Sequence, residues 1–445
     1  MKRFSVLWLV APLALPAVVR ADAPEIRWTV STAVERALAV HPSLAAAEAR
    51  RAETEWARQE AGAARGPVAS ARLSGSEFGE PMLVSPIHSF DPRRFPEFDE
   101  TLVQGSLDLR YTLLDSGARR QRMRQADARR DAAGAALAAT AQEVMARVAI
   151  TYAEVLALAE VRASERLRVE AVRRELGRVE QLLSAGRAAE LDRLRAEAAL
   201  AAAEAAEVAI ATRLDASERE LARWLAVDPE SARAVSLVPL AAPPPEERSA
   251  LESRAFAASP AIARARREAA AADAARALAR TAYFPELRAV GSLQQYGGGD
   301  LDFASEWNAG LVLAIPLWDG GATTARVRRA EASRDAATAA VAEAELAVAA
   351  GVDRGIAAWN EAAARSGALE RAVERLAEVA RVEKLRLDVG AGTQVDYLDA
   401  EAALASTRAE RTSAVAAALA ARVELARLAG ELGPDWIRKT LEEEP

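Results

Sequence analysis

The sequence predicts a mainly α-helical protein with a small β part, built as two tandem copies of one unit. Two segments of 67 residues, Gly117–Leu183 and Gly321–Leu387, contain no proline and are rich in Ala, Arg, Glu and Leu, which favours very long helices. Shorter segments before them alternate apolar and polar residues, as strands do. The glycine turns after the long helices, at Gly186 and Gly390, are 390 − 186 = 204 positions apart. A repeat on this scale indicates one structural unit written twice.

The first residues have the pattern of a secretory signal peptide. Lys2 and Arg3 precede an apolar run over residues 4–19, and a small-residue cleavage site follows at Ala21. We therefore expect residues 1–21 to be removed on export. Loss of three basic residues would change the formal charge from −7 to about −10, which gives no reason to expect a nucleic-acid partner.

Cysteine is absent from the sequence, so neither disulfides nor a lipid-modified cysteine are expected. After residue 21 the chain has no run of 18 or more apolar residues, so we expect no membrane-spanning helix. Any membrane-spanning part of the exported protein would then have to be made of strands.

The first unit is expected over residues 22–242. It begins with a helix over residues 28–64, which His41-Pro42 either bends or divides. Strands follow at residues 67–78 and 100–113, and a proline-rich irregular loop over residues 79–99 joins them. The long helix, the turn at Gly186 and a return helix over residues 188–227 complete the unit.

The second unit is expected over residues 243–433 and repeats this order. A helix over residues 259–280 precedes strands at 286–296 and 306–317, and the return helix covers residues 393–430. Both return helices are shorter than the long helices, so we expect each to stack end to end with its unit's first helix along the same long partner. The acidic tail, residues 434–445, is expected to be loosely held.

The alternation is clear over residues 100–113 and poor over residues 68–78. Strands of ten to twelve residues with aromatic residues near their ends have the dimensions of transmembrane β-hairpins. The alternative is a pair of soluble edge hairpins. Four strands cannot close a barrel, and an open edge in lipid would leave backbone groups unpaired. If these hairpins span a membrane, several chains must share the barrel.

The doubled order of elements resembles the TolC-type outer-membrane factor family over essentially the whole mature chain. The local signatures are a Gly-x5-Asp turn, at Gly186/Asp192 and Gly390/Asp396, and the strand ends Leu114-Asp115-Ser116-Gly117 and Trp318-Asp319-Gly320-Gly321. This resemblance implies a homotrimer in the outer membrane of a Gram-negative bacterium. Three chains would contribute four strands each to one 12-stranded transmembrane β-barrel in outer-membrane lipid, continued by a trimeric α-barrel in the periplasm.

The implied function is a passive exit duct of a tripartite efflux or type I secretion system. Its partners would be a periplasmic adaptor protein and an inner-membrane pump of the RND or ABC type. The alternative is that the chain is itself a periplasmic adaptor. An adaptor would show a single helical hairpin flanked by glycine-rich, lipoyl-like strands, whereas here the hairpin occurs twice and follows a strand pair each time.

By the same resemblance, Asp396 and Asp399 fall where the family has an acidic selectivity ring at the periplasmic entrance. Asp192 falls where the family has an aspartate that holds the gate. A ring of carboxylates would favour cations at the mouth. The alternative is local: aspartates in a first helical turn cap the helix and interact favourably with its dipole.

The two turns are the candidate contacts for the adaptor, because small residues permit another helical tip to approach closely. The alternative for each of these residues is a plain helix-to-helix turn. In the best-known members of the family a tyrosine and an arginine flank the second turn, and this chain has Leu387 and Gly392 there, so that clasp is not carried over. The candidate tip residues are Gly186, Arg187, Gly390, Ala391 and Gly392.

No set of catalytic residues emerges from the sequence. The two histidines, His41 and His88, lie far apart on a helix and in a proline-rich loop, and no glycine-rich phosphate loop follows a strand. We therefore expect a protein that is not an enzyme and needs no metal or other cofactor. A metal contact at His88 is the less favoured alternative to an exposed bystander.

Overall fold

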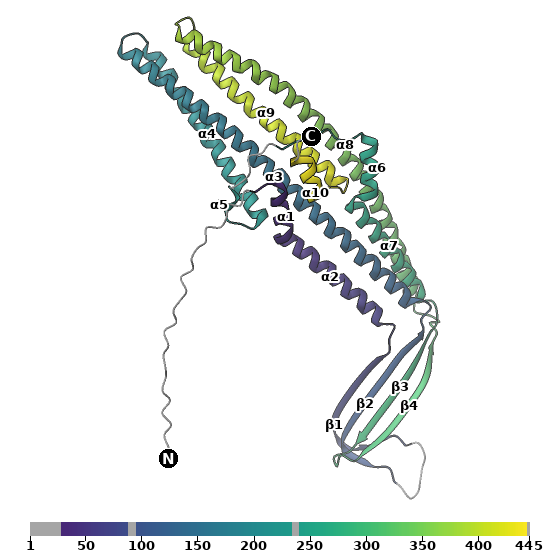
Figure 1. Ribbon diagram of the computed structural model, residues 1–445. Coiled ribbons are helices and arrows are strands. Elements are labelled where there is room, and N and C mark those ends of the chain that lie inside the picture. The colour runs from purple at the N-terminus through teal and green to yellow at the C-terminus, as the bar shows by residue number, and fades with distance from the viewer. Residues whose placement is uncertain (1–27, 88–94, 234–239, 443–445) are drawn as a thin grey trace, which may run out of the picture.

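A computed structural model describes residues 28–87, 95–233 and 240–442. The expected signal peptide, residues 1–21, and His88 lie outside these ranges. The molecule is elongated, with a four-stranded sheet at one end, two helical tips at the other and a layer of long helices between them (Figure 1). The tips and the sheet are therefore the two ends of one rod-like chain.

The two long helices form the backbone of this layer. They are α3, Ala118–Ser184, and α8, Ala322–Asp388, of 67 residues each, as predicted. Return helix α4 (Glu190–Leu225) and first-unit helix α2 (Pro42–Ala63) both pack on α3, while α9 (Gln394–Leu428) and α7 (Pro260–Thr281) both pack on α8. The end-to-end stacking expected from helix lengths is thus confirmed. Helices α7 and α9 also contact α3, which joins the two units.

His41-Pro42 divides the first helix, which was one of the two options. Helix α1 covers Val30–Val40, and α2 starts at Pro42, whose missing N–H is tolerated at the first helical position. The His41 ring accepts a hydrogen bond from the Ser43 amide (3.3 Å) and stacks on Trp224 with ring centroids 4.7 Å apart. Helix α6, Arg248–Ala258, was not predicted and lies against α8 and α7.

All four strands pair antiparallel in the order β1-β2-β3-β4. They are β1 (Val68–Leu83), β2 (Phe98–Leu114), β3 (Glu286–Gly297) and β4 (Phe303–Ala314). The first hairpin is longer than predicted, because pairing resumes at Met82 after a register shift that begins at Glu77. That shift accommodates Pro81, which has no N–H to donate to a ladder. The end predicted for the last strand, residue 317, is wrong: β4 stops before Pro316.

Both long helices begin at the same kind of turn. Gly117 and Gly321 have φ of 88° and 87°, a left-handed conformation that glycine adopts at little cost. The Asp115 carboxylate accepts hydrogen bonds from the Gly117 and Arg119 amides (3.2 and 2.7 Å). Asp319 does the same for Gly321 and the residue two further on. The repeated Asp-x-Gly motif therefore fixes how each strand passes into its long helix.

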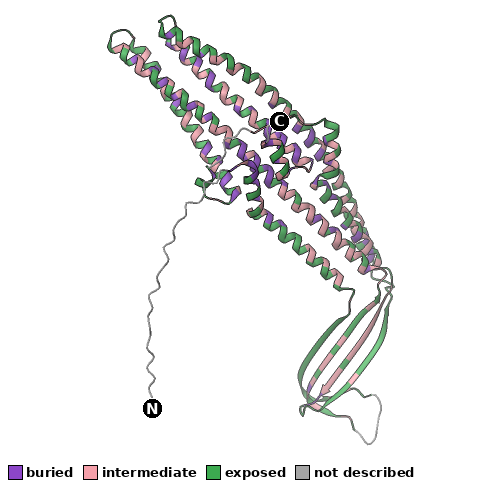
Figure 2. Cartoon of the chain, viewed as in Figure 1, coloured by how far each residue is buried: buried purple, intermediate pink, exposed green. Residues whose placement is uncertain are grey.

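The largest core lies in the middle of the rod, where α1 and the C-terminal segment cover α3, α4 and α9. Tyr152 is almost fully buried there and donates to the Trp28 carbonyl (2.9 Å). The short helices at this level are α5 (Pro229–Ala232), α10 (Pro434–Ile437) and a π-helical turn, Arg438–Glu442. Figure 2 shows that burial is concentrated at this level and sparse on the strands.

The C-terminal tail is not loosely held over residues 434–442, which corrects the sequence-based expectation. Ile437 and Leu441 are fully buried in the central core. Glu442 accepts a hydrogen bond from the Ser31 amide at the start of α1 (2.9 Å), and the Leu441 carbonyl accepts one from Ala241 (3.0 Å). The two buried side chains and these two hydrogen bonds hold the segment against the central core.

Candidate functional site

The two tips have the same backbone geometry. Gly186 and Gly390 have φ of 68° and 74°. The Gly186 amide donates to Leu183 O (2.9 Å) and the Arg187 amide to Leu182 O (2.8 Å), and the second tip makes the equivalent pair of bonds. This is the Schellman motif, which satisfies the last carbonyl groups of a helix and requires a left-handed residue. The repeated glycine therefore sets the chain reversal at each tip.

The surface of the tips is small and partly apolar. Arg187, Gly390 and Ala391 are exposed, and Val389 at the apex of the second tip has 77% of its surface exposed. Gly392 is the tighter position, because a Cβ there would lie 2.9 Å from Arg386 Cβ. The second tip thus combines an open apolar apex with a position that admits only glycine without a shift.

Asp192 and Asp396 occupy equivalent positions (192 + 204 = 396), and each carboxylate takes part in the cap at the start of its helix. The Asp192 carboxylate accepts from the Ala189 amide (3.2 Å). Asp396 accepts from the Thr393 hydroxyl (2.7 Å), and its own amide donates to that hydroxyl oxygen (3.2 Å). Both carboxylates lie in the first turn, where the helix dipole favours negative charge. The local interpretation therefore accounts for these two residues within one chain.

Asp399 has no such local role. It is exposed, lies one turn after Asp396 on the same face of α9, and makes no hydrogen bond or ion pair within residues 28–87, 95–233 and 240–442. Its counterpart in the first unit is Arg195 (399 − 204 = 195). The second hairpin therefore carries carboxylates at both of these positions, whereas the first hairpin has an arginine at the second of them.

A buried carboxylate joins the two hairpins about three helical turns from the tips. Glu175 on α3 has a side chain that is 1% exposed and accepts two bonds from Arg178 on the same helix (2.9 and 2.6 Å). Lys384 on α8 reaches across, with Nζ 3.6 Å from Glu175 Oε2 and 5.2 Å from the ring centre of Tyr397 on α9. Three helices from the two units therefore meet at the cluster Glu175, Lys384 and Tyr397, which we call the brace.

The brace could not be predicted from the sequence. Its members come from three helices and are separated by up to 397 − 175 = 222 positions, so no spacing rule relates them. A partial signal is present, because Glu175 interrupts the apolar positions of the α3 seam between Val172 and Val179. A charge at a seam position calls for a partner from a neighbouring helix.

The two faces of the sheet differ in chemistry. On one face, Leu107 on β2 pairs with Leu293 on β3, which pairs with Trp307 on β4. Large apolar side chains on this face are exposed, with 76% of Trp307 and 53% of Leu107 accessible. On the other face the same strands carry Asp108 and Ser292 and their polar neighbours. A sheet with an exposed apolar face and a polar face suits a wall between lipid and water.

Within the described ranges, none of the helices is long and apolar enough to cross a membrane. His41 is occupied by its cap and its contact with Trp224, and no group of three or more candidate metal ligands occurs among the described residues.

The chain matches one protein-family model and is similar in fold to many solved structures. The family model described as "Outer membrane efflux protein" matches residues 33–227 and 251–431. The outer membrane protein VceC from Vibrio cholerae is 20% identical with a TM-score of 0.77, covering 90% of this chain and 96% of that chain. No curated protein sequence gives a significant match.

Two further channels have the same fold. The Campylobacter jejuni CmeC outer membrane channel is 16% identical with a TM-score of 0.78, covering 92% of this chain and 88% of its own. The Neisseria gonorrhoeae MtrE outer membrane channel is 19% identical with a TM-score of 0.73, covering 90% and 88%. The match to the family model is in two parts that correspond to the two units of the sequence repeat.

Proposed function

This chain belongs to the outer membrane efflux protein family, and from that premise we propose that three copies close one continuous duct whose periplasmic mouth is set by the two helical tips. The protein is an outer-membrane efflux channel with a large periplasmic helical part. It is not a periplasmic adaptor, since the family model covers both helical hairpins and the helices that precede the strands.

The observation that carries the proposal is the incompleteness of the sheet. Strands β1 and β4 are both edges, of 16 and 12 residues, and neither pairs with a further strand among the described residues. Their apolar face is exposed, so in lipid both edges need partners. Joining β4 of one copy to β1 of the next supplies those partners, and three copies give 3 × 4 = 12 strands.

The acidic ring is proposed for the second hairpin. Asp396 and Asp399 share one face of α9, and Asp399 has no partner that explains it within the described part of the chain. Three-fold symmetry would bring six carboxylates around one axis and favour cations at the mouth. Asp192 is assigned the lesser role, because its neighbour on the same face is Arg195 and not a second carboxylate.

The tips are proposed as the contact for a helical periplasmic adaptor, which in turn couples the duct to an inner-membrane pump. Val389 and the flanking Gly390 and Ala391 give an exposed apolar apex, with Gly186 and Arg187 as the corresponding surface of the first tip. Small side chains let another helical hairpin approach the backbone closely.

The absence of cysteine allows a direct test of the shared barrel. We propose Ala71→Cys on β1 together with Ala309→Cys on β4, both on the apolar face of an edge strand. Three strand spacings, about 14 Å, and two register positions separate them within one chain, farther than a bis-maleimide with an ethylene spacer can span. In outer-membrane fractions, a short bis-maleimide should give dimer and trimer bands and none larger, because a closed ring exhausts the edges.

The matched control is Ala71→Cys with Ala289→Cys, whose second cysteine lies on β3, an inner strand. This pair should give monomer only. Bands that continue beyond the trimer, equal cross-linking in the control, or a chain that fractionates away from the outer membrane would contradict the proposed assembly.

A further inference from the structure

A hollow lies where the sheet meets the helices, and its charge is strongly positive. It has a volume of about 750 Å³. Its lining comes from the helix-side ends of all four strands, from α3, α7 and α8, and from the turn that follows α2. Five arginines and two acidic residues line it, so the excess is 5 − 2 = 3 positive charges per chain. The charged lining residues are Arg110, Arg119, Arg122, Arg288, Arg326, Asp115 and Glu286.

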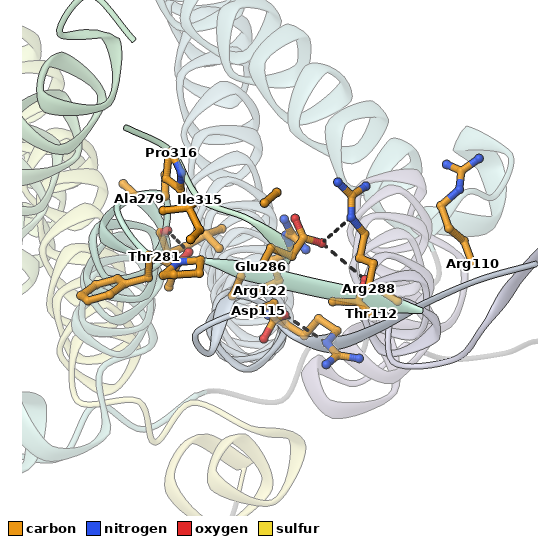
Figure 3. Close-up of a pocket in the computed structure, with 18 of the residues that line it drawn as sticks. Arg110, Thr112, Asp115, Arg122, Ala279, Thr281, Glu286, Arg288, Ile315 and Pro316 are labelled. Atoms are coloured by element: carbon orange, nitrogen blue, oxygen red, sulfur yellow. Dashed lines mark hydrogen bonds and ion pairs between the residues drawn. The ribbon is translucent and has the colours of Figure 1, made fainter. Parts of the chain in front are cut away.

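Both acidic residues are already engaged. Asp115 accepts from Arg119 Nε (3.0 Å) besides its two cap bonds. Glu286 lies 3.7 Å from Arg288 Nε and accepts from the Thr112 hydroxyl at 3.5 Å. Figure 3 shows these contacts of Glu286 as dashed lines and Arg110 standing apart from them. The other three arginines make no salt bridge with a described carboxylate, although the charge of Asp108, two residues before Arg110 on the same strand, interacts with that of Arg110.

Those three arginines are Arg110, Arg122 and Arg326. All are exposed, and none makes a hydrogen bond or ion pair with any residue that the structure describes. Arg122 and Arg326 are repeat equivalents (122 + 204 = 326), each the fifth residue of its long helix. A cation near a helix N-terminus is disfavoured by the dipole, whereas an anion is favoured. The position therefore suits a negatively charged guest.

The hollow opens on the polar face of the sheet. Arg110 pairs with Val68 and Val290, and its strand neighbour Thr112 pairs with Arg288, all on the face opposite Leu109 and Tyr111. If the apolar face meets lipid, as the proposed function requires, the arginines face the interior of the duct. Three copies would then present nine unpaired guanidinium groups at one level.

We propose that this belt, defined as Arg110, Arg122 and Arg326, binds multivalent oxyanions in transit, such as solutes bearing phosphate or clustered carboxylate groups. Guanidinium groups hold such anions through charge-assisted, often bidentate hydrogen bonds. The belt is positive and sits at the membrane end, while Asp396 and Asp399 are negative and sit at the tip. The duct would thus favour anionic solutes at its membrane end and cationic solutes at its periplasmic mouth.

The test measures block of single-channel current by inorganic triphosphate in a planar bilayer of zwitterionic phosphatidylcholine, whose headgroups carry no net charge, so that the added triphosphate is the only multivalent anion in the experiment. The Arg122→Gln/Arg326→Gln variant should weaken the apparent block constant about tenfold, as expected when two charge-assisted bonds per chain are lost. Adding Arg110→Gln should weaken it further.

The matched control is Arg124→Gln/Arg328→Gln. These arginines are also repeat equivalents (124 + 204 = 328), exposed, on the same two helices and without ion pairs in the described ranges, but they do not line the hollow. Block should be unchanged in this variant. Equal weakening in both variants, or conducting unmodified channels that triphosphate does not block, would overturn the belt while leaving the duct intact. Failure of the unmodified protein to conduct at all would instead refute the proposed function.

Discussion

Lys384 on α8 places its ammonium group 5.2 Å from the ring centre of Tyr397 on α9, close enough for a cation–π interaction. The same ammonium lies 3.6 Å from Glu175 Oε2 on α3. Within α8 it also pairs with Asp388 (3.0 Å). One side chain therefore links α8 to α9 of its own unit and to α3 of the other unit, near the tips.

We predict that Lys384→Met, which keeps an apolar stem, lowers the free energy of unfolding by about 0.5–1 kcal/mol, since Lys384 is partly exposed and its charge is screened. Thermal denaturation followed by circular dichroism measures this. Hydrogen exchange at the start of α9 should also accelerate. Lys439→Met is the control, because Lys439 is exposed and has no ion pair with the described residues. Identical behaviour of the two variants would contradict the brace.

The phenol of Tyr397 gives a pH-dependent prediction. Burial, then the nearby charges of Glu401 and Glu175, raise the pKa of Tyr397 from 10.0 to about 12. The folded chain thus holds this proton more tightly than the unfolded chain. The resulting stability is complete below pH 10 and is lost as the pH rises from 10 to about 12.

The measurement is a spectrophotometric titration of tyrosinate. The wild-type curve minus the Tyr397→Phe curve should have its midpoint near pH 12, and the variant should lose less stability than the wild type above pH 10. A difference curve centred at pH 10 would show that Tyr397 is solvated and that the buried contact with α3 does not form.

Close packing of α8 on α9 depends on two glycines one turn apart. A Cβ on Gly355 would lie 2.6 Å from Leu425 Cδ2, and one on Gly351 would lie 3.0 Å from Leu428 Cδ1. We predict that Gly355→Ala destabilises the protein by about 1–3 kcal/mol through overpacking of this buried contact. Thermal and denaturant unfolding both report it.

Gly134→Ala on α3 is the matched control, since no heavy atom lies within 4 Å of the added Cβ. It should stabilise by about 0.5–1 kcal/mol, as alanine is the better helix former. Both substitutions replace glycine by alanine within a helix. Changes of opposite sign in the free energy of unfolding would therefore report the packing at Gly355 and not the helix propensity of alanine. A stabilising Gly355→Ala would mean that the two helices lie further apart than described.

Much of the fold follows from local sequence chemistry. Proline-free segments rich in alanine and arginine predict both ends of each long helix to within one residue, and Pro42 marks the break between α1 and α2. The misses have tertiary causes. Helix α6 has a weak local pattern and is stabilised by packing on α8. The tail is ordered by Ile437 and Leu441, whose burial depends on α1, more than 390 residues away.

The candidate site divides in the same way. Gly186, Gly390 and the capping aspartates can be predicted because turn and cap chemistry is local. The brace and the arginine belt cannot, because their members come from different helices and strands whose juxtaposition the sequence does not encode at any fixed spacing. The repeat shows that Arg122 and Arg326 are equivalent, but only the structure shows that both line one hollow together with Arg110.

Block by a trivalent cation distinguishes an acidic ring at the second tip from carboxylates that only cap α9. Asp396→Ala with Asp399→Ala would remove 2 × 3 = 6 carboxylates from a trimer. We expect it to weaken block of single-channel current by hexaamminecobalt(III) by about tenfold or more, because a trivalent cation responds steeply to the local potential. Thr393→Ala is the control: it removes the cap bonds of Asp396 but leaves every carboxylate in place.

If the aspartates only cap α9, both variants should destabilise the helix start by a similar amount, about 0.5–2 kcal/mol, and neither should change the block. If they form the ring, only the double variant changes the block. Asp399→Ala alone sharpens the distinction, since Asp399 makes no cap bond and its loss should weaken the block without lowering stability. A block that survives Asp399→Ala unchanged would leave the carboxylate pair with a purely local role.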